Sequence, residues 1–358
     1  MMALGLNGVI IKNYQPQKII KMENYLEIFT NTVIGMANYQ WRQIVFDVPW
    51  NENWFWGLTI VSLGVWALEL LFPWRKNQKA YRRDFWLDWI YMYLNFFIFQ
   101  IGLFGLYDIL GSIFNSFGIT STSFALISKD AIPTWAFILI FFILNDFVQW
   151  FTHVLLHKYE FLWKFHKVHH SVKEMGFAAH LRYHWMETIV YRTIEYLPLA
   201  LLGIGLYDFF IIHLFSLAIG HHNHANVKVT GFYKAGVLGL LVCLFIIDQT
   251  GMELINAIAW IVGMPILFAL SLGPWMKYIF NSPEMHIWHH VRALPEGRIK
   301  GINFGISLAL WDYIFGSAVI PKDGRDIELG FDGVEEFPDS FAGQFTYGLV
   351  QKKEEKTS

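Results

Sequence analysis

The sequence predicts an all-α fold, a polytopic membrane helical bundle with a cytosolic helical cap. Two observations on composition lead to it: 55% of the 358 residues are hydrophobic, and only 16% are charged. A soluble globular domain would carry about 25% charged residues. The third observation is that every histidine except His213 lies in one of three segments, at 153–184, 221–224 and 286–290. Composition therefore predicts a membrane protein, and the histidines predict that its polar segments meet at one site.

Three apolar runs, at 54–72, 85–106 and 132–156, are long enough to cross a bilayer, which takes roughly 20 residues. Each run holds at most one Asp or Glu and no Lys or Arg. Charged side chains are costly inside the hydrocarbon region, so their scarcity fits membrane-spanning helices. We therefore predict three spans in this half of the chain.

Two later apolar stretches, at 188–220 and 236–272, are each interrupted by residues that favour turns. The first contains Gly-Ile-Gly at 203–205, and the second contains Asp-Gln-Thr-Gly at 248–251. Each stretch has histidines before and after it. If these histidines share one site, the chain must enter the membrane after one histidine segment and come back to the same side before the next. We predict a helical hairpin for the first stretch, and a second hairpin or a re-entrant pair of helices for the second, each turning at its break.

Lysine and arginine predict the orientation of the spans. One basic cluster follows the first run, at 75–83, and another follows the third run, at 158–173. Basic residues next to spans favour the cytoplasmic side. We therefore expect an integral, multi-pass protein of a bacterial inner membrane, with its histidine-rich segments on the cytoplasmic side.

The chain divides into three parts around these runs. Residues 1–51 form an amphipathic N-terminal lead, 52–335 form the membrane domain with all the histidine segments, and 336–358 form a charged C-terminal tail. The net charge of −2 argues against a nucleic-acid partner, which would require a basic patch. The single cysteine excludes an intramolecular disulfide and a cysteine-based iron–sulfur cluster.

The spacing of the histidines predicts metal binding. His153 and His157 are four residues apart, so on a helix they share one face. The pattern H-x-x-H-H occurs twice, and each copy offers three more imidazoles. Together these three sets exceed what one tetrahedral or octahedral ion needs, so they predict two metal ions. An all-nitrogen set suits iron, zinc or copper rather than magnesium or calcium.

The carboxyl group of Asp146 lies seven residues before His153, on the same helix face and inside a predicted span. A carboxylate there is costly without a partner. We expect it to accept a hydrogen bond from a ligand histidine and so to fix which ring nitrogen faces the metal.

Several ordered motifs between about 140 and 335 are similar to those of the fatty acid hydroxylase superfamily, often called sterol desaturases. The segments that carry the resemblance are Asp146-x6-His153-x3-His157, Leu162-Trp163-x2-His166-Lys167-Val168-His169-His170-Ser171, Leu181-Arg182-Tyr183-His184-Trp185-Met186-Glu187, His224-Ala225-Asn226-Val227, Ser282-Pro283-Glu284-Met285-His286-Ile287-Trp288-His289-His290, Asn303-Phe304-Gly305 and Leu310-Trp311-Asp312-Tyr313-Ile314-Phe315-Gly316. Trp185 stands where the family has proline, and a mostly apolar insertion at about 233–272 precedes the last histidine segment. The insertion leaves the substrate open.

The resemblance implies membrane helices under a cytosolic cap that holds a non-haem di-metal centre, and the use of O₂ and two electrons to hydroxylate or desaturate a lipid. We predict two iron ions, because zinc has no redox chemistry; zinc remains a possible substitute in purified protein. The predicted ligands are His153, His157, His166, His169, His170, His184, His221, His224, His286, His289 and His290. Residues expected to support them are Asp146, Asn226, Asn303 and Asp312. No catalytic residue is predicted beyond the metal centre.

The predicted partners are a membrane lipid as substrate, O₂ and a separate electron-donor protein. The donor must be separate because the chain has no C-x-x-C cluster and no haem or flavin fingerprint. His180 and His222 are undecided between ligand and structural roles, and His213 is expected to be a packed interior residue.

Three alternatives stay open at this point. A histidine-rich metal transporter would spread ionisable residues near the membrane midplane, whereas here they concentrate at span ends, which favours an enzyme. Acyl-chain desaturases share the histidine-box logic but lack the Trp-Asp-x-x-Phe-Gly element at 311–316. A catalytically silent, zinc-bound relative is the third. Whether the reaction is hydroxylation or desaturation is not decided by the sequence.

Overall fold

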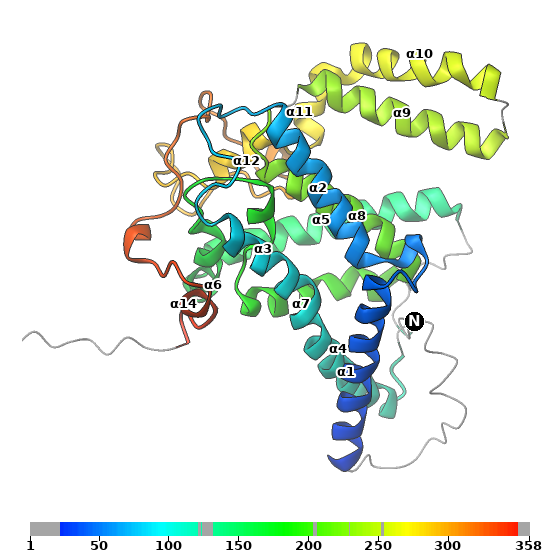
Figure 1. The fold of residues 1–358 in the computed structure, drawn as a ribbon, viewed down its shortest axis with the longest axis vertical. Helices are drawn as coiled ribbons and strands as arrows, with labels where there is room; N and C mark the ends of the chain where they lie inside the picture. Colours follow the sequence, from blue (N-terminus) through cyan, green and yellow to red (C-terminus); the bar gives the residue numbers. More distant parts are fainter. Residues whose placement is uncertain are drawn as a thin grey trace, which may run out of the picture.

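The computed structural model describes residues 22–120, 123, 132–202, 206–228, 230–251 and 254–349. Within these residues the chain is all-helical, apart from three isolated β-bridges. This confirms the predicted fold class (Figure 1). The elements are α1 Met22–Ile44, η2 Trp50–Glu52, α2 Trp54–Leu71, α3 Phe85–Tyr93, η3 Leu94–Ile98, α4 Phe99–Ser116, α5 Thr134–Lys158, α6 Glu160–His170, η5 Phe177–Leu181, α7 Trp185–Leu202, α8 Leu206–His224, α9 Gly231–Thr250, α10 Leu254–Leu272, η6 Gly273–Trp275, α11 Met276–Ile279, α12 Pro283–His289, α13 Leu310–Ile314, η7 Val334–Glu336 and α14 Phe341–Phe345.

Four helical stretches are long and apolar enough to cross a membrane: Trp54–Leu71, Phe85–Ser116, Thr134–Lys158 and Trp260–Ile279. The first three coincide with the predicted spans, and the fourth lies in the later apolar region. The protein is therefore a multi-pass membrane protein. The second stretch joins α3 and α4 through the π-helical turn η3, where the Asn95 side chain donates hydrogen bonds to the carbonyls of Leu181 and Tyr183.

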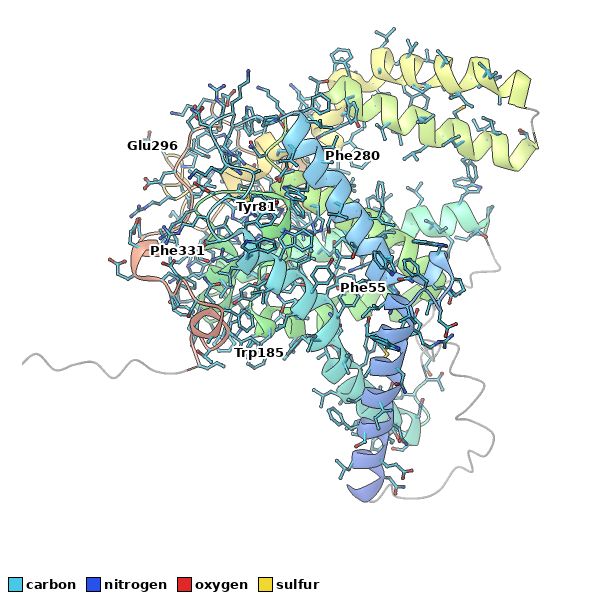
Figure 2. The ribbon with its side chains drawn as sticks, in the orientation of Figure 1. Phe55, Tyr81, Trp185, Phe280, Glu296 and Phe331 are labelled. Carbon is cyan, nitrogen blue, oxygen red and sulfur yellow. The ribbon has the colours of Figure 1, made fainter. Side chains whose placement is uncertain are left out.

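A cap of short helices and loops forms where α5 and α8 end. One of its apolar clusters packs Trp74, after α2, against Ile287 and Trp288 of α12. The C-terminal part contributes as far as Tyr347, which packs against a cluster of Phe337, Tyr91 and Val168. Glu296 and Phe331 lie on the far side of the molecule from the tip of the α9–α10 hairpin (Figure 2). Segments distant in sequence thus meet in the cap, which holds the histidines.

The predicted hairpin in the second interrupted stretch is present. Helices α9 and α10 pack against each other, and α9 ends at Thr250, followed by Gly251, whose φ of +62° suits a glycine at a helix C-terminus. The pair projects away from the other helices (Figure 1). The turn predicted at 203–205 lies outside the described residues; α7 and α8 lie on either side of it.

Candidate metal centre

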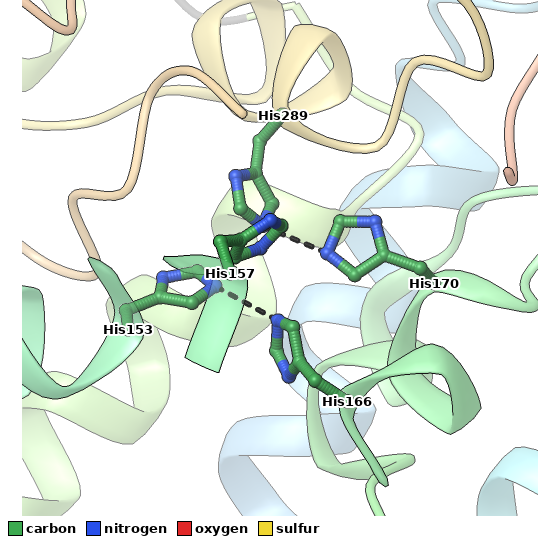
Figure 3. A group of neighbouring side chains, drawn as sticks. All are labelled: His153, His157, His166, His170 and His289. Atoms are coloured by element: carbon green, nitrogen blue, oxygen red, sulfur yellow. Dashed lines mark hydrogen bonds between the residues drawn. The ribbon is translucent and has the colours of Figure 1, made fainter. Parts of the chain in front are cut away.

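Nine of the histidines converge in two groups in the cap. The first group, called cluster A, has two members on α5, two on α6 and one on α12 (Figure 3). One imidazole nitrogen from each member lies within 4.8 Å of all the others, and every member is buried. The Nε2 atoms of two pairs are only 3.1 Å apart. Cluster A consists of His153, His157, His166, His170 and His289.

The second group, cluster B, has one member on α6 and one on α8, and two from the α12 segment. Its Nε2 atoms are also close together, at 3.0 Å between His224 and His286 and 3.2 Å between His286 and His290. Cluster B consists of His169, His224, His286 and His290, all buried.

Each H-x-x-H-H segment serves both clusters. His166 and His170 belong to cluster A, whereas His169 between them belongs to cluster B. The α12 segment is arranged the opposite way, with His289 in cluster A and its two neighbours in cluster B. Rings of the two clusters therefore touch, and the centroids of His170 and His290 are 4.4 Å apart. The arrangement is consistent with a di-metal site.

The other ring nitrogen of several members is bound to the backbone, which fixes the tautomer. Nδ1 of His153 lies 2.8 Å from the Phe304 carbonyl, and Nδ1 of His289 lies 2.8 Å from the Ile302 carbonyl. His169 and His224 make the same kind of contact, at 3.2 and 2.8 Å. A carbonyl can only accept, so Nδ1 carries the hydrogen and the Nε2 lone pair faces the cluster. Such a donor set fits a transition metal.

Burial keeps the cap histidines neutral. It lowers the pKa of His169 to about 3, and it lowers the pKa values of His166, His170, His286, His289 and His290 well below the usual 6.5. Neighbouring imidazoles add to the effect, because a second positive charge at such short range is unfavourable. Neutral imidazole is the form that binds a metal ion.

Asp146 and Asp312 support the clusters through a loop rather than by direct contact with a histidine. The Asp146 carboxylate accepts hydrogen bonds from the backbone of Ser307 and Leu308 and from the Trp311 indole. Asp312 accepts from the backbone of Phe304 and Gly305 and from the Trp150 indole. The expected bond from a ligand histidine to Asp146 is absent among the described residues. Both carboxylates instead fix the loop whose carbonyls orient His153 and His289.

The two asparagines also act on the backbone. Asn303 donates to the carbonyls of Met285 and Val319 and accepts from Val319 N, so it joins α12 to the same loop. Asn226 pairs with both the N–H and the carbonyl of Arg75, which ties the end of α8 to the segment after α2. Asn226 therefore positions a segment of the cap. These two hydrogen bonds do not involve an imidazole of either cluster.

Two predicted ligands, His184 and His221, lie outside both clusters. His184 accepts a hydrogen bond from the Met186 N–H and packs on Phe165. His221 contacts Ser62 through Nε2 and His180 through Nδ1, each at 3.0 Å. His221 is therefore engaged through both ring nitrogens, whereas His184 is held through Nδ1 alone. His213 packs against aromatic rings, as expected for an interior residue.

Three supporting residues were missed from the sequence. Glu187 Oε2 lies 3.0 Å from His166 Nδ1. Glu69 accepts from the backbone N–H groups of Phe177 and Asn226. The buried Arg182 side chain binds Asp84, Asp88 and Ser171, and its carbonyl faces His169. The sequence could have pointed to Glu69, because it is the one charged residue in its predicted span. For Arg182 the sequence offered nothing beyond its place in a motif.

A cavity of about 120 Å³ adjoins the two clusters. Its lining includes histidines of both clusters, among them His153 and His286, and side chains from α5, α7 and α8. A small molecule or part of a larger one can therefore reach the imidazole groups.

Comparison with known proteins agrees with this geometry. The family model described as fatty acid hydroxylase matches residues 138–240. These residues belong to the fatty acid hydroxylase family. The matched segment runs from α5 into α9, so it contains His153 to His224 but stops before α12. The family predicted from the histidine motifs is confirmed.

The chain is also similar to the ornithine lipid hydroxylase OlsE of Rhizobium tropici. It is 26% identical over 191 residues, which cover 53% of this chain and 44% of the relative. The alignment thus spans less than half of the relative's length. No solved structure matches the chain.

Proposed function

We propose that the protein is a membrane-bound di-iron oxygenase that hydroxylates, or desaturates, a lipid at a C–H bond. It would use O₂ and electrons from a separate donor protein. The observation that carries this proposal is the pair of buried, all-histidine clusters in contact with each other. The histidine-rich cap is proposed to face the cytoplasm, because basic clusters follow the spans that lead to it.

Iron fits the donor set better than zinc does for this function. Cluster A would hold one ion and cluster B the other, each through neutral imidazole nitrogens. Iron supplies the redox chemistry that activation of O₂ requires, which zinc lacks. A zinc-bound, silent protein would have the same histidines, so metal analysis must accompany any activity assay.

The chain's own residues have three tasks in this proposal. Backbone carbonyls at 302 and 304 hold two cluster A imidazoles in the metal-binding tautomer. The Glu187 carboxyl lies 3.0 Å from His166 Nδ1, where a proton shared between the two groups would leave His166 Nε2 free to bind the metal. Burial of all nine histidines keeps bulk water from the centre, which protects a reactive oxidant from side reactions. The adjoining cavity receives the part of the lipid that reacts.

The relative's substrate suggests which lipid to test first. OlsE is described as acting on an ornithine lipid. We propose a lipid of this kind as the first candidate substrate for this chain, with sterols and fatty acyl lipids as comparisons.

Metal analysis of detergent-purified protein tests the proposal, with the intact chain compared to a His169→Ala/His289→Ala double variant. One substitution falls in each cluster. About two irons per chain, lost in the variant, together with addition of one oxygen atom to a lipid in the presence of O₂ and reductant, would support it. His222→Ala is the control, because His222 belongs to neither cluster. Failure to bind any metal after iron reconstitution would reject it.

A further inference from the structure

A second cavity, of about 550 Å³, opens on the surface of the cap. It shares no lining residue with the cavity beside α5, α7 and α8. Several of its lining side chains are exposed, among them Lys76, Asn77 and Arg325, so the cavity is open to solvent. Since the cap is proposed to face the cytoplasm, this cavity would be reached from the cytosol.

One wall of this cavity is the outer side of the segment that carries three cluster histidines. Ile287 lines the cavity, and in the sequence it stands between His286 of cluster B and His289 of cluster A. Ile287 packs with Trp74 and Ile302 in one buried apolar cluster, and Trp74 also lines the cavity. The Ile302 carbonyl lies 2.8 Å from His289 Nδ1. The same packed side chains therefore adjoin both the cavity and the metal centre.

This position matters because the proposed reaction consumes electrons that a separate protein delivers. The rate of electron transfer through a protein falls steeply with distance, so the donor must dock where little protein separates its redox group from the metal centre. Helix α12 presents histidines to both clusters and Ile287 to the cavity. A donor seated in this cavity would therefore be close to both clusters at once.

Hydrogen bonds hold the rim of the cavity in place. The Arg75 guanidinium and the Gln78 amide both donate to the Met175 carbonyl, each at 2.8 Å. These bonds join the segment that follows α2 to the segment that follows α6, and all three residues line the cavity. A rim that is already ordered lowers the entropy cost of binding a partner.

The charge of the cavity indicates which kind of protein fits it. Its two acidic lining residues are already engaged by their neighbours. Glu174 accepts a hydrogen bond from the Arg83 backbone N–H. Asp326 lies 3.2 Å from Arg325 Nε. An acidic partner would be attracted by the remaining positive charge and a basic one repelled. The basic lining residues, twice as many as the acidic ones, are Arg75, Lys76, Lys173 and Arg325.

We propose that this cavity is the docking site of a small acidic protein that carries one electron at a time. The inference rests on the proposed function and names the chemistry of its electron donor. Each docking would transfer one electron and oxidise the carrier, so two dockings would supply one turnover. The two electrons, with two protons, reduce one oxygen atom of O₂ to water, while the other oxygen atom enters the lipid C–H bond to give C–OH.

Binding of a ferredoxin to zinc-loaded protein tests the inference without turnover. The probe is an acidic plant-type [2Fe–2S] ferredoxin, and the protein is held in phosphatidylcholine nanodiscs, which carry no net charge. Lys76→Glu/Arg325→Glu should weaken binding at least about tenfold at low salt, and salt should reduce the difference because ions screen exposed charges. Lys158→Glu/Arg298→Glu is the matched control, since it makes the same change of charge at exposed residues that do not line the cavity. It should lose much less affinity.

Reduction of iron-loaded protein provides a second readout. In the absence of O₂, reduced ferredoxin should reduce the Lys76→Glu/Arg325→Glu variant more slowly than the intact protein. Photoreduced deazariboflavin, a small uncharged reductant that needs no docking site, should reduce both at the same rate. Equal slowing with the two reductants would show that the substitutions disturb the metal centre itself, which would overturn the inference.

The binding outcomes are equally decisive. Failure of the ferredoxin to bind the intact protein, or equal binding by the intact protein and Lys76→Glu/Arg325→Glu, would overturn the inference. Tight binding of cytochrome c, a basic carrier, would overturn it too, because charge would then not select the partner. Unchanged ferredoxin binding with loss of bound phosphatidylglycerol in native mass spectra would assign the basic residues to lipid head groups instead. If the ferredoxin docks as expected but no lipid is oxidised, the proposed function fails and the docking site stands.

Discussion

Clusters A and B contain similar ligands but depend on different scaffolds. Cluster A has five histidines, two of them on the long helix α5, and its ring nitrogens bond to carbonyls of the 302–304 loop. Cluster B has four histidines, and its ring nitrogens bond to the carbonyls of Arg182 and Gly220. The first cluster therefore depends on a distant loop, and the second on the segment between η5 and α7 and on the α8 backbone. Because the scaffolds differ, we expect that substitutions can weaken one candidate metal site without weakening the other.

Removing one ligand from each cluster should give the largest effect. His286→Ala leaves three histidines in cluster B, whereas His157→Ala leaves four in cluster A, enough for a tetrahedral ion. We expect His286→Ala to lower the metal affinity of cluster B by more than roughly a hundredfold. Losing a residue that only hydrogen-bonds to a ligand usually costs about 10- to 100-fold, and His286 would be a ligand itself. His157→Ala should retain most of its metal. Metal analysis after dialysis against a chelator measures both.

Activity should fall sharply in His286→Ala, because the proposed chemistry needs both ions, and should fall less in His157→Ala, which keeps them. Equal metal loss in the two variants would contradict the idea that the fifth histidine of cluster A is a spare ligand.

Removing the anchor of the 302–304 loop should have the next largest effect. Asp312→Ala leaves the Phe304 and Gly305 N–H groups and the Trp150 indole without their acceptor. Each buried, unmatched donor costs about 1–3 kcal/mol, so we expect the free energy of unfolding to fall by about 3–5 kcal/mol. Thermal unfolding of metal-free protein measures the loss.

Metal analysis of the same variant sharpens the comparison. Cluster A should lose its ion at lower chelator concentrations than in the intact protein, while cluster B changes little. Asp332→Ala, which removes an exposed carboxylate, is the control. Identical losses at the two clusters would show that the loop supports both.

Substitution of His184 should have the smallest effect on metal binding, because His184 lies outside both clusters. Burial lowers its pKa to about 4 from 6.5, so the folded protein resists a proton that the unfolded chain accepts. Its contribution to the free energy of unfolding is therefore present above about pH 6.5 and is lost as pH falls towards 4. His184→Phe should reduce this pH dependence by up to one proton and leave metal content unchanged. A variant that loses metal would restore His184 as a ligand.

The sequence predicted the spans and the existence of the clusters, because both follow from local rules. Runs of apolar residues define helices that suit a bilayer, and a spacing of four brings His153 and His157 to one face. The same geometry explains the division within each H-x-x-H-H segment. Successive residues are about 100° apart around a helix, so His169 and His170 point to different clusters.

The roles of the supporting residues could not be predicted in this way. Asp146 is on the correct face of α5, but its partners come from a loop some 160 positions away in the chain. His184 and His221 stand at motif positions typical of ligands. In the structure, however, His184 packs on Phe165 and His221 contacts Ser62, outside both clusters. Such contacts depend on how the cap folds over the helices, which spacing along one element does not encode.

The α9–α10 hairpin begins and ends at nearly the same point. Gly231, at its start, is so close to Gly273, at its end, that a Cβ atom on Gly231 would overlap the Gly273 carbonyl oxygen. The Lys234 side chain fastens this base by donating to the Asn281 carbonyl, one residue before the cap of α12. The hairpin is thus an insertion between His224 and His286 whose two ends lie side by side. Evolution could lengthen, shorten or replace it without changing the spacing of the histidines on either side, provided that its two glycines remained in contact.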